Sequence, residues 1–168
     1  MSTKTSIRDY FVHMFDYEDW ANRKVLDYLK SDDAHDQVED IFSHLIADMT
    51  PWACILGGRE VPIDLDCSPN WTVEECEANL STSMSEIKSY VAGLSDVDFG
   101  NVVTSYAPDG RQFDNTVAEV LTQILSHGQH HRGQIEWIVE HESGEYLGTS
   151  YMPYVRLLRQ EAEGTIVQ

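Results

Sequence analysis

Apolar residues recur every third or fourth position along most of the chain, and this spacing constrains the fold more than any other feature. Side chains at that spacing share one face of an α-helix, so each stretch carries an apolar stripe that has to be buried. We expect four long helices, over about residues 6–30, 35–56, 72–94 and 116–141. Burying their stripes together predicts an all-α four-helix bundle, formed as one domain over residues 1–168.

Short motifs predict where two of these helices begin. Thr72 with Glu75, and Thr116 with Glu119, have the spacing of a capping box, in which each side chain pairs with a free amide of the other residue. Between the third and fourth helices, residues 101–115 place a Pro-Asp-Gly turn between β-branched and aromatic residues, which predicts a short hairpin. Residues 146–164 predict a short last helix over the bundle, followed by a frayed tail.

The charge balance limits the partners. With 29 acidic and 11 basic residues the formal net charge is −18, which repels nucleic acid and anionic lipid surfaces. No apolar run approaches the about 20 residues of a membrane span, and the amino end lacks a signal-peptide pattern. We therefore expect a cytoplasmic protein with no nucleic-acid or membrane partner. Three cysteines at irregular spacing predict free thiols: Cys54, Cys67 and Cys76.

The stretch LSHGQHHRGQI, residues 125–135, contains a histidine cluster. On a helix, His127 and His131 lie about 40° apart and within or beside the apolar stripe, whereas His130 points to a different side. Two imidazoles one helical turn apart can bind one divalent ion. The alternative, given equal weight, is that both are core histidines hydrogen-bonded to carbonyl groups.

A third ligand has to come from another helix, and His44 is the candidate. Ile41, Trp52 and Ile55 lie close to it around the second helix, which suggests that His44 faces inward. Asp48, one turn further on, could orient His44 or a bound water, or could serve only as a surface residue. Three protein ligands leave open positions on the ion, as in catalytic sites, whereas structural sites use four. Three other histidines are expected at the surface: His13, His35 and His141.

Three stretches of the chain resemble, in order and spacing, the DinB family of bacterial four-helix proteins. They are residues 17–29, 44–52 and 117–135, and the similarity covers about four fifths of the chain. The most specific element is the run HGQHHRGQI together with the upstream histidine. The resemblance implies an up-down-down-up bundle, commonly a homodimer. It also implies a divalent metal ion, either zinc, nickel or iron, on three ligands: His44, His127 and His131.

Characterised relatives in this family include metal-dependent transferases of the thiols bacillithiol and mycothiol, and a mycothiol-dependent isomerase. The resemblance thus favours an enzyme that joins a low-molecular-weight thiol to an electrophilic small molecule. Alternatives are a metal-dependent hydrolase, in which Asp48 or His130 moves a proton, and a non-catalytic metal-binding or interaction protein. His130 is otherwise a surface residue. Arg132 is expected to serve packing, an ion pair or a dimer contact.

Overall fold

The computed structural model of the chain describes residues 5–31, 34–62, 65–107 and 109–164. Within these ranges the protein is mainly helical, with one small two-stranded sheet, so the expected all-α class and the hairpin between the third and fourth helices are confirmed. The elements are α1 (Ile7–Leu29), α2 (Asp36–Leu56), α3 (Val73–Gly93), the 3₁₀ turn η1 (Asp98–Gly100), β1 (Val102–Tyr106), β2 (Gln112–Thr116), α4 (Val117–Glu142) and α5 (Tyr151–Ala162).

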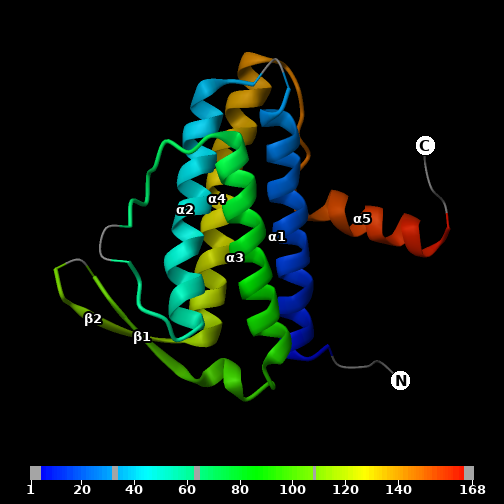
Figure 1. The fold of residues 1–168 in the computed structure, drawn as a ribbon. Coiled ribbons are helices and arrows are strands. Elements are labelled where there is room, and N and C mark those ends of the chain that lie inside the picture. The colour runs from blue at the N-terminus through cyan, green and yellow to red at the C-terminus, as the bar shows by residue number, and fades with distance from the viewer. Residues whose placement is uncertain (1–4, 32–33, 63–64, 108, 165–168) are drawn as a thin grey trace.

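The four long helices lie side by side around one core (Figure 1). Each contributes large side chains with no more than 1% exposure, such as Phe15 of α1, Phe42 of α2, Leu80 of α3 and Leu121 of α4. Full burial of a side chain of this kind contributes about 1.5–3 kcal/mol to folding. In the long connection between α2 and α3, the described residues 65–72 run back beside α2 before α3 begins. This connection brings a loop close to the middle of α2.

Both predicted capping boxes are present. The side chain of Thr72 accepts a hydrogen bond from the amide of Glu75, whose carboxylate accepts one from the amide of Thr72. Thr116 and Glu119 form the same pair at the start of α4. Because Thr116 is also the last residue of β2, the hairpin leads directly into α4 and fixes its first turn.

Only the first turn of α5 packs against the bundle. Tyr154 is 6% exposed and packs against the rings of His13, Tyr17 and Trp20, whereas the residues from Arg156 to Gly164 are exposed. Figure 1 shows the rest of α5 pointing away from α1. The expected position over the bundle is therefore found for one turn only, and the end of the predicted tail, residues 165–168, lies outside the described residues.

Three side chains of α1 differ from the simple stripe. Tyr10, expected on the apolar face, is 51% exposed. Glu18 and Asn22, which lie one turn apart, are fully buried. Two polar groups therefore sit in the core, where they need partners from another helix. Among the described residues, no helix is both long enough and apolar enough to cross a membrane.

Candidate metal centre

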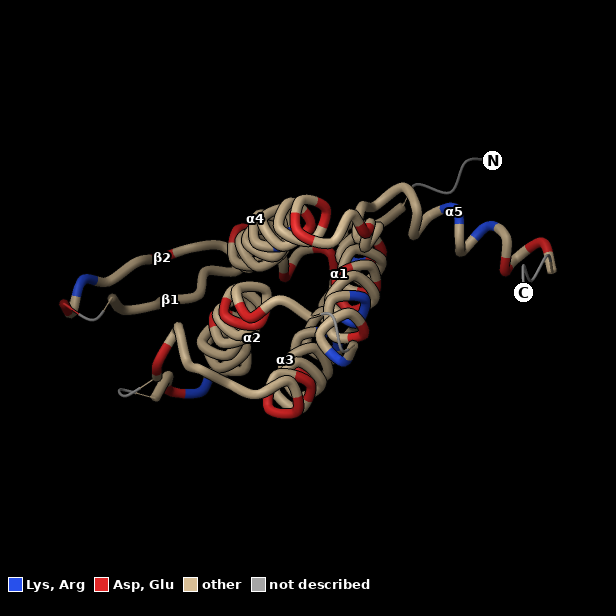
Figure 2. Tube along the Cα trace, turned by 90° about the horizontal axis from the view of Figure 1, so that it is seen from above, with Lys and Arg blue, Asp and Glu red and all other residues tan. Residues whose placement is uncertain are grey.

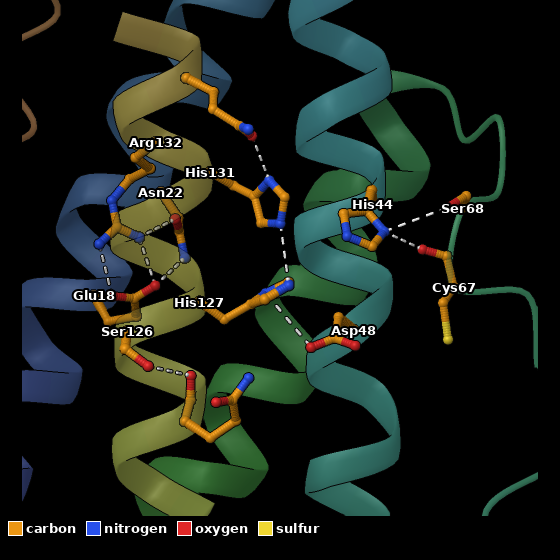
Figure 3. A network of polar contacts seen from close by, with 12 residues as sticks. Glu18, Asn22, His44, Asp48, Cys67, Ser68, Ser126, His127, His131 and Arg132 are labelled. Carbon is orange, nitrogen blue, oxygen red and sulfur yellow. Dashed lines mark hydrogen bonds and ion pairs between the residues drawn. The ribbon is translucent and has the colours of Figure 1, made fainter. Parts of the chain in front are cut away.

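Two neighbouring helices, α2 and α4, bring three half-buried histidines together (Figure 3). His127 and His131 lie one turn apart on α4, and His44 faces them from α2. The ring centroids are 4.4 Å apart for His127 and His131, 4.8 Å for His44 and His131, and 5.5 Å for His44 and His127. One ring nitrogen from each residue lies within 4.8 Å of the other two, so the group could hold a metal ion.

His44 lies at the edge of the buried face of α2, not at its centre. The centre of that face is formed by residues such as Phe42, Leu45 and Met49, while Ile41 and Trp52 are half-buried like His44 itself. The inward position expected from the helical wheel is therefore only partly realised. Because all three imidazoles are half-buried, part of each ring is in contact with solvent.

Each imidazole has a partner at its Nδ1 atom. Nδ1 of His44 donates to the carbonyl oxygen of Cys67, and Nδ1 of His131 lies 2.7 Å from Oε1 of Gln134. Nδ1 of His127 lies 3.5 Å from Oδ2 of Asp48. When Nδ1 carries the proton, Nε2 presents a lone pair, so these contacts prepare three Nε2 atoms as ligands.

The distance between two of those nitrogens fits a shared cation. Nε2 of His127 and Nε2 of His131 are 3.1 Å apart. Nitrogen ligands of one tetrahedral zinc ion lie about 3.3 Å apart, because each bond is about 2.0 Å long. With a proton on one Nε2 this contact is a hydrogen bond between the rings, and with both protons on Nδ1 a cation between the two lone pairs would remove their repulsion. Burial lowers the pKa of both imidazoles below the usual value, which keeps them neutral and able to bind metal near pH 7.

The two residues considered for proton transfer have different positions. Asp48 faces His127, with its Oδ2 atom 3.5 Å from Nδ1 of that ring, whereas His44 was one of the partners suggested for it. His130 is exposed, with its ring edge-on to His131 at a centroid distance of 5.0 Å. Asp48 therefore adjoins the three-histidine group directly, whereas His130 lies on its outer side.

The other histidines serve the scaffold. His141 is exposed, as expected, and His13 and His35, which were also expected at the surface, are half-buried. His13 has its Nε2 atom 2.9 Å from the hydroxyl of Tyr151 and so links α1 to α5. His35 accepts a hydrogen bond from the amide of Gln37 and caps the start of α2.

All three cysteines are free thiols, as predicted. Cys54 and Cys76 are buried, and burial raises the pKa of the Cys76 thiol to about 11. Cys67 is exposed, and its sulfur points away from His44 while its carbonyl oxygen faces that ring (Figure 3). No side-chain pattern could have revealed this contact, because the acceptor is a backbone atom in a loop. Gln134, in contrast, stands three residues after His131, a spacing that places it next to that ring.

Arg132 forms a buried ion pair with α1, which was one of its expected roles. Its guanidinium donates to both carboxylate oxygens of Glu18 and to the side-chain oxygen of Asn22. The signal for this contact was present in the sequence, since Glu18 and Asn22 interrupt the apolar stripe of α1 at helical spacing. Beside the ion pair a narrow recess runs between the helices, lined by Glu18, Leu45, Asp48, Met49, Trp52, Ile124, His127 and Gly128.

The fold and the site together define a mainly helical protein with a three-histidine candidate metal centre between α2 and α4. A family model described as the DinB superfamily matches residues 1–135, and the chain belongs to this family. The chain is 21% identical over 169 residues to Protein DinB of Bacillus subtilis (strain 168), an alignment that covers 91% of this chain and 98% of that protein. No solved structure matched the chain significantly.

Proposed function

We propose that the protein is a divalent-metal-dependent enzyme that joins a low-molecular-weight thiol to an electrophilic small molecule. The observation that carries the proposal is the convergence of three half-buried imidazoles, each with a partner at Nδ1. Three protein ligands leave an open position, which a structural site does not need. Membership of the DinB superfamily supports the thiol chemistry, because the characterised relatives considered above use low-molecular-weight thiols.

The proposed ligands are His44, His127 and His131, and zinc, nickel or iron would suit them. When bound, the ion would supply Lewis acidity that favours the deprotonated form of a thiol at neutral pH. Asp48 would accept the proton that the thiol loses, a role supported by the partial exposure of its carboxylate and its position beside His127. Trp52 and Ile124, which line the narrow recess beside His127, would give the centre apolar neighbours on that side.

The same proposal includes an up-down-down-up order of the four long helices, a homodimer and a cytoplasmic location. The helix order is supported by the direction of α3, which runs the same way as α2 (Figure 1). The homodimer rests on the family resemblance alone. Three unpaired cysteines fit a reducing compartment such as the cytoplasm.

The experiment compares three samples: metal-reconstituted protein, chelator-treated protein and the His127→Ala variant. Each is incubated with bacillithiol, mycothiol, glutathione or cysteine together with an alkylating electrophile, and the thioether product is quantified. We expect product formation above the uncatalysed rate only in the metal-reconstituted sample, and only with the correct thiol. Equal rates in the three samples would exclude catalysis at this centre.

Two further results would select the alternatives. Metal-dependent turnover without any thiol would support a hydrolase that uses Asp48 as its base. Stoichiometric metal that raises the melting temperature, without turnover of any substrate in the panel, would support a non-catalytic role in which the ion links α2 to α4.

A further inference from the structure

The strongest polar feature outside the histidine group is the buried ion pair between α1 and α4. Glu18 is 0% and Arg132 is 1% exposed. Nη2 of Arg132 lies 2.8 Å from Oε2 of Glu18, and Nη1 contacts Oε1 of Glu18 and, at 2.8 Å, Oδ1 of Asn22. The planar face of the guanidinium also lies 5.6 Å from the ring centre of Tyr17. Two parallel hydrogen bonds of this kind fix both distance and orientation.

Gly128 makes room for this ion pair. A Cβ atom at position 128 would lie 2.0 Å from Oε1 of Glu18 and 3.0 Å from Nη1 of Arg132. Any side chain there would therefore displace the carboxylate. Gly133 lies in the same helix and the same sequence run, yet a Cβ atom there would meet nothing within 4 Å. Of these two helical glycines, only Gly128 is required by its surroundings.

Two residues of the ion-pair network (Glu18, Asn22, Gly128 and Arg132) are sequence neighbours of the two α4 histidines. Gly128 directly follows His127, and Arg132 directly follows His131. The carboxylate of Glu18 thus contacts α4 at both levels where an imidazole leaves the helix, on the side turned toward α1 (Figure 3). A rotation or shift of α4 at these levels would change the direction of both imidazoles.

We propose that Glu18, Asn22, Gly128 and Arg132 are positioning residues, which lock α4 against α1 so that His127 and His131 point at His44. The proposal rests on the metal centre proposed above. Stability alone does not explain the buried ion pair, because well-packed apolar side chains of similar volume often stabilise a core equally well. The bidentate geometry supplies what apolar packing lacks, a single fixed rotation of α4.

The experiment uses two sets of variants. Gly128→Ala pushes the carboxylate away while all polar groups remain, and Gly133→Ala is its matched control in the same helix. A triple variant, Glu18→Met with Asn22→Leu and Arg132→Met, removes the network while filling its volume with apolar atoms. Thermal unfolding identifies the variants that retain a cooperative fold. If Gly128→Ala does not fold, the test uses the triple variant.

Two measurements are made on the folded variants. The first is zinc affinity, by competition with a chromophoric chelator. The second is the ¹⁵N spectrum of the histidine rings in metal-free protein, which reports the tautomer and the hydrogen bond at each ring. We expect Gly128→Ala and the triple variant to lose at least about tenfold in zinc affinity, the size of effect seen when residues that orient metal ligands are changed. Their ring signals for His127 and His131 should shift or broaden, while Gly133→Ala should match the wild type.

The two proposals fail separately. If the wild type binds no zinc, nickel or iron, the proposed function is wrong, and the ring spectra of metal-free protein still decide whether the network positions the histidines. If the wild type binds zinc and the folded triple variant binds it equally well with unchanged ring spectra, the network serves only stability and the positioning proposal is overturned.

Discussion

At the scale of single residues, the chemistry of the three histidines depends on which atom faces each Nδ1. A backbone carbonyl at Cys67, a side-chain amide at Gln134 and a carboxylate at Asp48 occupy those places. The carbonyl of Cys67 and the amide of Gln134 are neutral acceptors, whereas Asp48 carries an ionisable carboxylate. His127 is therefore the ligand whose basicity responds most to its neighbour.

Replacing any one ligand should abolish stoichiometric metal binding without unfolding the protein. We expect His44→Ala, His127→Ala and His131→Ala to keep the helical circular dichroism of the wild type, because the apolar stripes persist without the ion. Elemental analysis of each purified variant gives the metal content. His141→Ala, which changes an exposed histidine, is the control and should retain the metal. A full metal complement in His44→Ala would remove α2 from the site.

The buried thiol of Cys76 should make stability depend on pH in the alkaline range. Its pKa rises from 9.0 to about 11 in the folded protein, so the neutral thiol is the form that folding favours. The resulting stabilisation is complete below pH 9, falls as the pH rises from 9 to about 11, and amounts to roughly 2–3 kcal/mol.

Urea unfolding of the wild type and of Cys76→Ala at several pH values measures this contribution. We expect the stability advantage of the wild type to shrink across that interval. Tyrosines that titrate in the same range are present in both proteins, so their effects cancel in the comparison. An advantage that stays constant from pH 8 to 11 would contradict the prediction.

At the scale of elements, local signals predicted the fold well. Thr72 and Thr116 marked the starts of α3 and α4, because a capping box involves only residues three positions apart. The histidine pair of α4 followed from helical spacing in the same way. The partners in long-range contacts could not be named from the sequence. Glu18 and Asn22 interrupt the apolar stripe of α1, but Arg132 is 114 residues away from Glu18, and the carbonyl of Cys67 has no side-chain signature. The position of α5 was predicted only in part. Of its apolar side chains Tyr154 is buried against α1, but Leu157 and Leu158 extend beyond the bundle and stay exposed.

The docking of α5 should depend on one aromatic side chain. Tyr154 is 6% exposed and contacts three rings of α1, so Tyr154→Ala should lower the free energy of unfolding by about 2–4 kcal/mol. Protease cleavage within α5 should become faster. Leu157→Ala, at a position that is 37% exposed, should change stability by less than about 0.5 kcal/mol. Equal effects of the two substitutions, measured by urea unfolding, would contradict this account.

At the scale of the whole molecule, negative charge dominates. Acidic residues occur along all four long helices, with fewer lysines and arginines between them (Figure 2). With a net charge of −18, the mean field repels polyanions and attracts cations, including divalent metals.

Double-stranded DNA should therefore not bind usefully at physiological salt, because binding requires cationic side chains that release counterions from the phosphates. A gel-shift titration with a random duplex, at low and at physiological ionic strength, measures this. Arg8→Ala, which removes an exposed cation on α1, should leave the result unchanged. A tight complex whose affinity falls steeply with salt would show a basic surface that the described residues do not contain.

The proposed ligands lie on two helices, His44 on α2 and the other two on α4. This arrangement would limit the free energy by which a bound metal stabilises the fold. If His127 and His131 bind a metal, they would form a local chelate that needs only one turn of helix, so an unfolded chain with transient helix would still bind the ion through two nitrogens. Only His44 would add an affinity that exists in the native state alone. The gain in folding free energy would therefore be smaller than the native affinity implies.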